Sequence, residues 1–161
     1  MTKHPRTFLA VSDQSEECVT ALIYAGMRAR AATANLKILR CAQVPGWGGW
    51  VGLDRAITQD AVDSARIAGT KHVDLVEART GVLAELVISE DEPVDAIRQA
   101  VADDKSIKVL VLASGDGRSG PGPLVSRLGK GKPLADRPIA VTVVPGGLSD
   151  AALDEMGGMS G

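Results

Sequence analysis

Residues 107–113 read IKVLVLA and form the most continuous apolar run of the chain. Polar sequence flanks the run on both sides, with DDKS before it and SGDG after it. Consecutive apolar and β-branched residues over so short a length favour a strand that is buried on both faces of a sheet. We therefore expect this stretch at the centre of a parallel sheet.

Outward from this run, strand-like and helix-like segments alternate along the chain. The expected strands are 7–11, 36–44, 83–89, 107–113 and 139–144. The expected helices are 15–32, 54–76 (weakened near Gly69 and Thr70), a third beginning at Pro93, and a short one at 124–129. Alternation of this kind predicts βαβ units, and therefore a Rossmann-like α/β fold with helices on both faces of a parallel sheet.

Length and composition indicate a single domain. The chain has 161 residues, of which we expect about 5–146 to form the core and 147–161 a tail that is loose beyond Met156. Its net charge is −2, with acidic and basic residues interspersed, so no basic footprint for nucleic acid is present. No segment has the roughly 18 consecutive apolar residues of a membrane span. Without a signal-peptide pattern at the N-terminus, we expect a cytoplasmic protein.

The cysteines and histidines do not form a recognisable metal site. Cys18 and Cys41 lie in apolar segments, which favours buried, reduced thiols over a disulfide. The two histidines, His4 and His72, are not close in sequence to a cysteine pair. We therefore expect no bound metal, except Mg²⁺ together with a nucleotide.

Two unusual loops follow expected strands and could face one another. One is SDQSEE at 12–17, and the other is SGDGRSGPGP at 114–123. Ligands of open parallel sheets bind beyond the carboxyl ends of the strands, where the strand order reverses. If the strands at 7–11 and 107–113 are neighbours, the two loops form one site. Asp13, with Glu16 three residues later, has the spacing of a helix capping box, and its carboxylate could also accept hydrogen bonds from a ligand.

The second loop is rich in glycine. Its glycines could bring backbone N–H groups close to a phosphate, or they could simply belong to a flexible surface turn, and both interpretations stay open. These glycines are Gly115, Gly117, Gly120 and Gly122. The spacing Gly-x-Gly-x-x-Gly matches the dinucleotide fingerprint. However, Pro121 and Pro123 crowd the expected helix start, and no acidic residue ends a strand about 20 residues later.

Catalytic residues are not apparent in the sequence. We interpret Ser12 and Ser15 as turn residues rather than nucleophiles, because no histidine is placed by sequence to activate them. The carboxylates are scattered over expected helices. Trp47 and Trp50 bracket two glycines and either form a hydrophobic lid or partner contact, or close the edge of the core.

The sequence resembles the universal stress protein family over about residues 5–146. The segments that carry the resemblance are FLAVSDQSEECVTAL, LKILRCAQV, EDEPVDAIRQAV, IKVLVLASG and IAVTVVP, and GPGPLVS resembles a bacterial subgroup. The resemblance implies five parallel strands in the order 3-2-1-4-5. It also implies homodimers that pair through the last strand, here 139–144, whose edge has unpaired backbone groups.

The resemblance further implies ATP or another adenine nucleotide as a ligand. Asp13 and Val44 match the positions that contact adenosine, and Gly117 and Gly120 match the first phosphate-binding glycines. Lys130 and Gly131 stand where the family has glycine and a hydroxyl residue. The complete set of expected nucleotide-binding residues is Ser12, Asp13, Val44, Gly115, Gly117, Gly120, Gly122, Ser126 and Lys130.

Three functions follow as hypotheses. The first is a stress-associated homodimeric binding or signalling protein that binds adenine nucleotide. The second is a nucleotide-free interaction module for an unknown protein partner, suggested by the departures at Lys130 and Gly131. The third is slow ATP hydrolysis, which no positioned base or set of metal ligands supports.

Overall fold

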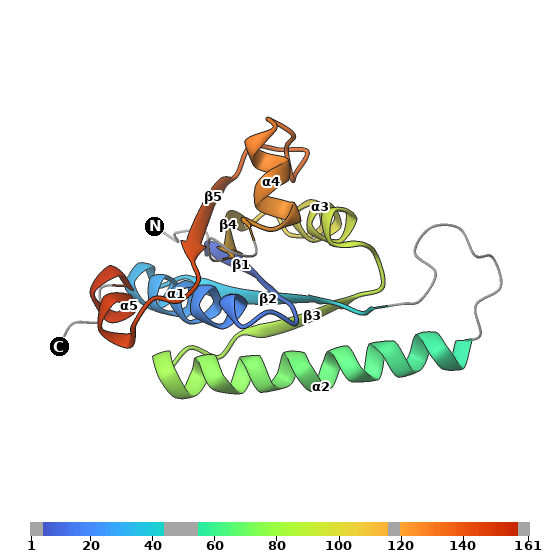
Figure 1. Ribbon diagram of the computed structural model, residues 1–161, viewed down its shortest axis with the longest axis horizontal. Coiled ribbons are helices and arrows are strands. Elements are labelled where there is room, and N and C mark those ends of the chain that lie inside the picture. Colours follow the sequence, from blue (N-terminus) through green and yellow to red (C-terminus); the bar gives the residue numbers. More distant parts are fainter. Residues whose placement is uncertain (1–4, 44–54, 116–119, 158–161) are drawn as a thin grey trace.

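The computed structural model describes residues 5–43, 55–115 and 120–157. A five-stranded sheet with the order β3-β2-β1-β4-β5 forms the centre of the molecule, and all four strand pairs are parallel (Figure 1). The strands are β1 (Thr7–Ser12), β2 (Asn35–Cys41), β3 (Glu85–Ser89), β4 (Ile107–Ser114) and β5 (Ala140–Pro145). The helices are α1 (Glu17–Ala32), α2 (Arg55–Thr80), α3 (Pro93–Asp103), α4 (Pro123–Gly129) and α5 (Asp150–Gly157). The predicted fold class and strand order are confirmed.

Two hydrophobic clusters cover the two faces of the sheet. On one face Ala10 packs with residues of α1 and α2, and on the other Leu9 packs with residues of α3 and with β4. This alternation is the period of two that side chains follow along a strand. Along β4, Leu110, Val111 and Leu112 are at most 2% exposed. The apolar run at 107–113 therefore forms the buried central part of the sheet, as predicted.

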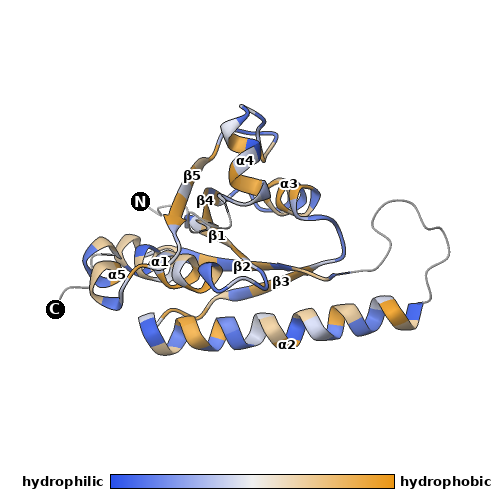
Figure 2. Ribbon diagram, viewed as in Figure 1, coloured by the Kyte–Doolittle hydropathy of each residue, from blue (hydrophilic) through white to orange (hydrophobic). Residues whose placement is uncertain are grey.

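Glycines allow close packing of the long helix α2 against its neighbours. A Cβ on Gly26 of α1 would lie 2.7 Å from Val76 Cγ1, and one on Gly69 would lie 2.6 Å from Leu86 Cδ1. The expected weakening of the helix near Gly69 and Thr70 is wrong, because α2 continues unbroken to Thr80. Gly69 lies against Leu86 of β3, where a larger side chain would not fit. This contact explains why glycine occurs inside the helix despite its low helix propensity. Figure 2 shows hydrophobic and hydrophilic residues alternating along α2.

The C-terminal segment departs from expectation. Residues of the expected tail form α5, which packs on α1, with Leu153 buried beside Met27. A Cβ on Gly157, one residue beyond Met156, would collide with Met27, so the helix end itself is closely packed. The burial of Leu153 against α1 explains why this segment is a packed helix, which its Gly- and Met-containing composition did not indicate. The rest of the segment expected to be loose, 158–161, lies outside the described residues. The expected ends of the last strand, Ile139 and Val144, each shift by one residue, to Ala140 and Pro145.

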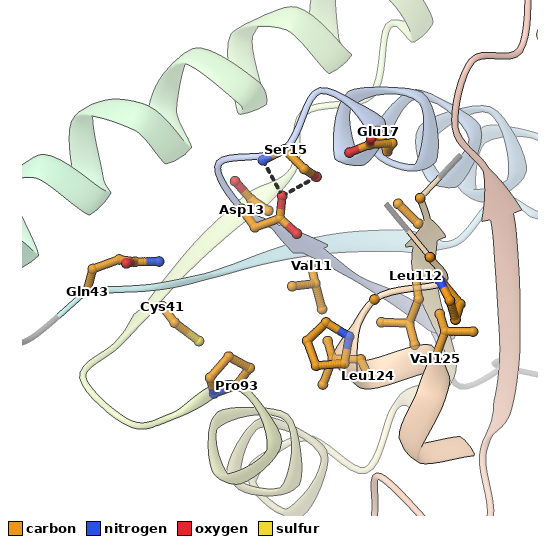
Figure 3. A pocket seen from close by; sticks show the side chains of 17 residues that line it. Val11, Asp13, Ser15, Glu17, Cys41, Gln43, Pro93, Leu112, Leu124 and Val125 are labelled. Carbon is orange, nitrogen blue, oxygen red and sulfur yellow. Dashed lines mark hydrogen bonds between the residues drawn. The ribbon is translucent and has the colours of Figure 1, made fainter. Parts of the chain in front are cut away.

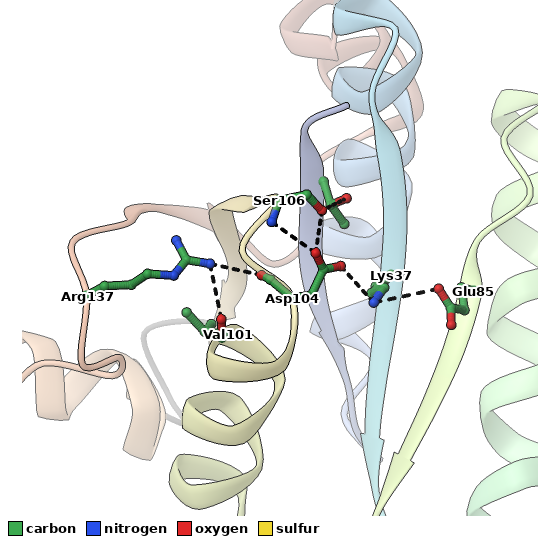
Figure 4. Close-up of polar contacts among 7 residues, drawn as sticks. Lys37, Glu85, Val101, Asp104, Ser106 and Arg137 are labelled. Atoms are coloured by element: carbon green, nitrogen blue, oxygen red, sulfur yellow. Dashed lines mark hydrogen bonds and ion pairs between the residues drawn. The ribbon is translucent and has the colours of Figure 1, made fainter. Parts of the chain in front are cut away.

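A polar network joins the amino ends of three strands to the end of α3 (Figure 4). Lys37 Nζ lies 2.7 Å from Asp104 Oδ2 and 3.7 Å from Glu85 Oε2. Asp104 Oδ1 accepts hydrogen bonds from Ser106 N at 2.9 Å and from Ser106 Oγ at 2.6 Å. Arg137 donates to the carbonyls of Val101 and Asp104, near the C-terminus of α3. These contacts hold β2, β3 and the α3–β4 connection together.

We expect this network to contribute to stability at neutral pH and to be lost in acid. The hydrogen bond from Lys37, followed by those from Ser106, lowers the pKa of Asp104 to about 2. A carboxyl whose pKa is lower in the folded chain than in the unfolded chain stabilises the fold above about pH 4, and the contribution disappears as pH falls toward 2. Urea unfolding of Asp104→Asn should show a loss of about 1–2 kcal/mol at pH 7 and a flatter pH dependence between 4 and 2. Asp103→Asn, an exposed neighbour, serves as the control, and an equal loss there would contradict the assignment.

Candidate functional site

A cavity opens at the carboxyl ends of β1 and β4, the two strands at which the order of the sheet reverses (Figure 3). Its volume is about 360 Å³, which lies within the range of small-molecule sites. The β1–α1 turn, the β4–α4 loop, the ends of β2 and β4, and the start of α3 contribute to its walls. The lining residues are Val11, Ser12, Asp13, Ser15, Glu17, Cys41, Gln43, Pro93, Leu112, Ala113, Gly115, Gly120, Pro121, Gly122, Pro123, Leu124 and Val125.

The β1–α1 turn holds the carboxylate of Asp13 at one side of the cavity. Asp13 Oδ1 accepts hydrogen bonds from the backbone N–H of Ser15 at 2.7 Å and from the Ser15 hydroxyl. Ser15 Oγ in turn accepts from the N–H of Cys18 at 3.3 Å. The predicted capping box is therefore wrong: no side chain of Glu16 or Asp13 caps α1, because Asp13 bonds within its own turn and Ser15 reaches the helix. The second Asp13 oxygen has no hydrogen bond with a described residue and could accept one from a ligand.

The β4–α4 loop reaches the opposite side of the cavity through its glycines. Gly120 and Gly122 have φ values of +74° and +89°, which side-chain-bearing residues rarely adopt. A Cβ at either position would meet no atom within 4 Å, so backbone conformation rather than space requires glycine here. At Gly120 and Gly122 the loop therefore lines the cavity with backbone atoms and no side chain.

The cavity combines an apolar interior with acidic groups at its edge. Val11, Leu112, Leu124 and Pro93 supply apolar surface, and they surround the centre of the view in Figure 3. Asp13 and Glu17 carry the charges, and no lysine or arginine occurs among the described lining residues. Such a lining suits a flat, largely uncharged ring system that offers hydrogen-bond donors to a carboxylate.

Five of the nine predicted site residues line this cavity. They are Ser12, Asp13, Gly115, Gly120 and Gly122. Ser126 and Lys130 do not: the Ser126 carbonyl accepts the N–H of Lys130 at the end of α4. Val44 and Gly117 lie outside the described residues, as do Trp47 and Trp50.

Several lining residues were missed by sequence reasoning. Cys41 and Gln43 come from the end of β2, and Pro93 comes from the start of α3. The position of Pro93, at a helix start four residues after the end of β3, was a signal that could have found it. Leu124 and Val125 carry no such signal, because the apolar face of a short helix normally packs in the core.

On the other face of the sheet, Ser12 contacts a histidine that is 60 residues away in sequence. The Oγ of Ser12, which is 2% exposed, lies 2.6 Å from Nδ1 of His72 on α2. Arg40 Nη1 donates to the same Oγ at 3.1 Å and to the Asp13 carbonyl at 2.7 Å. Sequence spacing places no histidine beside Ser12, but the fold brings His72 within hydrogen-bond distance of it, and Ser12 ends β1 where a turn residue was predicted. The reason is tertiary: α2 lies alongside the sheet and brings His72 to the end of β1.

The environment of His72 favours the neutral ring. Burial first, and then the positive charge of Arg40, lowers its pKa below the ordinary value, while Asp13 acts in the opposite direction. Because Arg40 already donates to Ser12 Oγ, the Ser12 hydroxyl proton is free to point at His72 Nδ1. We infer that neutral His72 carries its proton on Nε2.

The two thiols are unreactive at neutral pH. Burial raises the pKa of both Cys18 and Cys41 to about 11. Both are free, as predicted, and Cys18 lies against the backbone of Asp13. Within the described part of the chain, no group of three or more histidine, cysteine or acidic residues is arranged to hold a metal ion.

A parallel α/β sheet with a crevice at its reversal point defines a class of ligand-binding folds. Among solved structures, universal stress proteins share this fold. UspA from Lactobacillus plantarum superposes with a TM-score of 0.69 at 19% identity, covering 89% of this chain and 99% of that one. A universal stress protein from Archaeoglobus fulgidus has a TM-score of 0.62 at 14% identity, covering 86% and 92%.

Two further neighbours are complexes with adenine nucleotides. The Archaeoglobus fulgidus universal stress protein with dAMP has a TM-score of 0.57 at 21% identity, covering 86% of this chain and 97% of that one. A universal stress protein with cAMP has a TM-score of 0.54 at 18% identity, covering 89% and 99%. No protein-family model and no curated sequence matches the chain. None of the described helices has the length and apolar character needed to cross a membrane.

Proposed function

We propose that this chain is a universal stress protein that binds an adenine nucleotide in the cavity between the β1–α1 turn and the β4–α4 loop. The observation that carries the proposal is the position of the cavity at the sheet reversal, with Asp13 on one side and an apolar slot beside it. The slot suits the faces of adenine, and the free oxygen of Asp13 suits an adenine amine or a ribose hydroxyl. The dAMP and cAMP complexes of proteins with the same fold agree with this ligand class.

The contacts that the described lining residues offer suit the nucleoside better than the phosphates. Without a lysine or arginine among the described lining residues, a triphosphate gains little from direct charge pairing. AMP and ATP should therefore bind within about tenfold of one another, and Mg²⁺ enters only with the nucleotide. The GPGPLVS segment, at 120–126, supplies part of the wall and fits the bacterial subgroup that it resembles.

The test is isothermal titration calorimetry with adenosine, AMP and ATP, combined with mass spectrometry of small molecules released from the purified, acid-denatured protein. We expect about one adenine ligand per chain and weaker binding of guanosine. The proposal would be rejected if no nucleotide co-purifies with the protein and calorimetry detects no binding. That outcome would favour the nucleotide-free interaction module, which the absence of basic groups among the described lining residues also fits.

We further propose that two copies pair through β5 to form a stress-associated signalling dimer. Among the described residues, β5 pairs with β4 and with no other strand, so its other edge offers backbone groups for pairing. Ala140 and Val143 on this strand are exposed, and Val143 is 39% exposed. Apolar exposure on an edge strand suits a self-complementary interface.

Placing a charge on this edge should break the dimer. In Val143→Lys, two like charges would meet across a symmetric interface, and we expect the dissociation constant of the dimer to rise at least tenfold. Sedimentation velocity over a concentration series measures this change. Leu83→Lys, at a residue that is 71% exposed and precedes β3, is the control and should leave the dimer intact. A wild-type chain that stays monomeric at high concentration would contradict the proposed dimer.

A further inference from the structure

A second cavity, separate from the proposed nucleotide site, lies between α2 and the β1–α1 turn. Its volume is about 560 Å³, and we call it the α2 groove. It is lined by Asp13, Gln14, Ser15, Glu16, Val19, Arg40, Ser64, Ile67, Ala68, Lys71 and His72. The β1–α1 turn is the wall between the two cavities, since Asp13 and Ser15 line both. Figure 3 shows α2 beyond this turn, on the side away from Val11 and Pro93.

The α2 groove contains a largely buried guanidinium, that of Arg40, which forms no ion pair with any described residue. Arg40 is 7% exposed, and no described carboxylate forms a salt bridge with it. Its Nη1 donates only to neutral oxygens, those of Ser12 and the Asp13 carbonyl. Its Nε and Nη2 make no hydrogen bond to a described residue and are not among the fully buried atoms without a partner, so they are open to solvent in the groove. Buried guanidinium groups are normally paired with anions, so an arginine left in this state points to a missing anionic partner.

Further donors line the same groove. Lys71 is exposed and has no ion pair with any described residue, and His72 is the next residue of α2. In its neutral form His72 would have a free Nε2–H, because its Nδ1 is engaged by Ser12. Ser64 lines the same groove about two turns earlier on α2, roughly 10 Å along the helix axis from Lys71, and therefore lies apart from the cationic donors. The donors that come together from β2 and α2 are those of Arg40, Lys71 and His72.

The other lining residues of the α2 groove are apolar or acidic, and they indicate which further chemical groups a ligand should have. Val19, Ile67 and Ala68 form an apolar side, and Ile67 is 61% exposed. The carboxylates of Asp13 and Glu16 belong to the opposite wall, on the turn, and Asp13 is held there by Ser15. A ligand with an anionic head toward Arg40, Lys71 and His72 and a small apolar body toward Ile67 would satisfy both sides.

We propose that the α2 groove is a second binding site, specific for a phosphate monoester with a small apolar body. The dianionic head pairs with Arg40 and Lys71 and accepts a hydrogen bond from His72. The body covers Val19 and Ile67. This site is independent of the proposed nucleotide cavity and requires no nucleotide.

His72 provides the readout. The positive charge of Arg40 contributes to holding the His72 pKa below its ordinary value, and a bound anion would offset that charge and raise the pKa again. The chain contains two histidines, so His4 serves as an internal control in the same spectra. Sulfate is a suitable first probe, because its charge stays constant between pH 5 and 8.

The experiment is an NMR pH titration of the histidine rings with sulfate, against chloride at equal ionic strength. We expect the His72 pKa to rise by at least half a unit with sulfate, with no change at His4. Lys71→Gln, at an exposed position where the fold should tolerate it, should weaken sulfate binding at least fivefold. Lys108→Gln, an exposed lysine at the start of β4, should leave it unchanged. No sulfate-dependent change at His72, or equal losses in both variants, would overturn the anion site.

A second measurement tests the apolar part of the ligand. Butyl phosphate should bind at least threefold more tightly than inorganic phosphate in wild type, and this preference should disappear in Ile67→Ser. Equal affinity of the two compounds in wild type would overturn the assignment to an ester with an apolar body. Adenosine should not displace sulfate, whether or not it binds elsewhere, so failure of the nucleotide proposal would not affect this result. Displacement by adenosine would show a single shared site and reject the second one.

Discussion

Truncation of Leu110 to alanine should destabilise the fold by about 2–5 kcal/mol, because it leaves a cavity in the centre of the sheet. Leu110 is 0% exposed and lies in the middle of β4, where it pairs with Leu9 of β1 and Val141 of β5. Rigid strands on both sides prevent the structure from collapsing around the missing atoms. Against a typical stability of about 5–15 kcal/mol, such a loss would bring the protein close to unfolding at 37 °C.

Leu83→Ala is the matched control for this prediction. Leu83 is 71% exposed, so the same truncation removes little buried surface and should change the free energy of unfolding by less than about 0.5 kcal/mol. Urea denaturation followed by circular dichroism measures both variants. Similar losses in the two would mean that Leu110 is not in the core, and the strand order would then need revision.

Replacement of Val11 by phenylalanine should abolish nucleotide binding while the fold persists. Val11 is the penultimate residue of β1, two residues before Asp13, and supplies apolar surface to the proposed nucleotide cavity. The larger ring would occupy part of the 360 Å³ that adenine needs. Since the cavity is open space rather than packed core, the ring can be accommodated without the full cost of overpacking. We expect at least a hundredfold loss of AMP affinity in calorimetry.

Val62→Phe serves as the control for the blocked cavity. Val62 lies on α2, belongs to none of the hydrophobic clusters and does not line this cavity. The variant should bind AMP as wild type does. A Val11→Phe protein that is folded and still binds AMP with unchanged affinity would place the nucleotide elsewhere. Sulfate binding in the α2 groove should be retained in both variants, since neither residue lines it.

Much of the architecture followed from local patterns. The buried run at 107–113, the alternating segments and the glycine-rich loop were enough to predict a parallel α/β fold and the place of its crevice. Five of the predicted site residues do line that crevice. Local prediction failed where a side chain had two possible partners: Asp13 bonds to Ser15 of its own turn and not to the helix start. It also failed at α5: Asp150–Gly157 contains several good helix formers, but its place on α1 depends on the burial of Leu153 against Met27.

The sequence by itself determined which segments along the chain form strands and which form helices, because side-chain periodicity and turn residues act over a few neighbouring positions. Only the tertiary structure decided which distant groups meet. His72 reaches Ser12 across 60 residues because α2 packs along the sheet, and Arg40 reaches both Ser12 and Asp13 because β2 pairs with β1 in one particular register. Such contacts depend on how complete elements pack, which no short stretch of sequence encodes. The α2 groove, with an arginine that forms no ion pair with a described residue, is therefore a property of the folded chain alone.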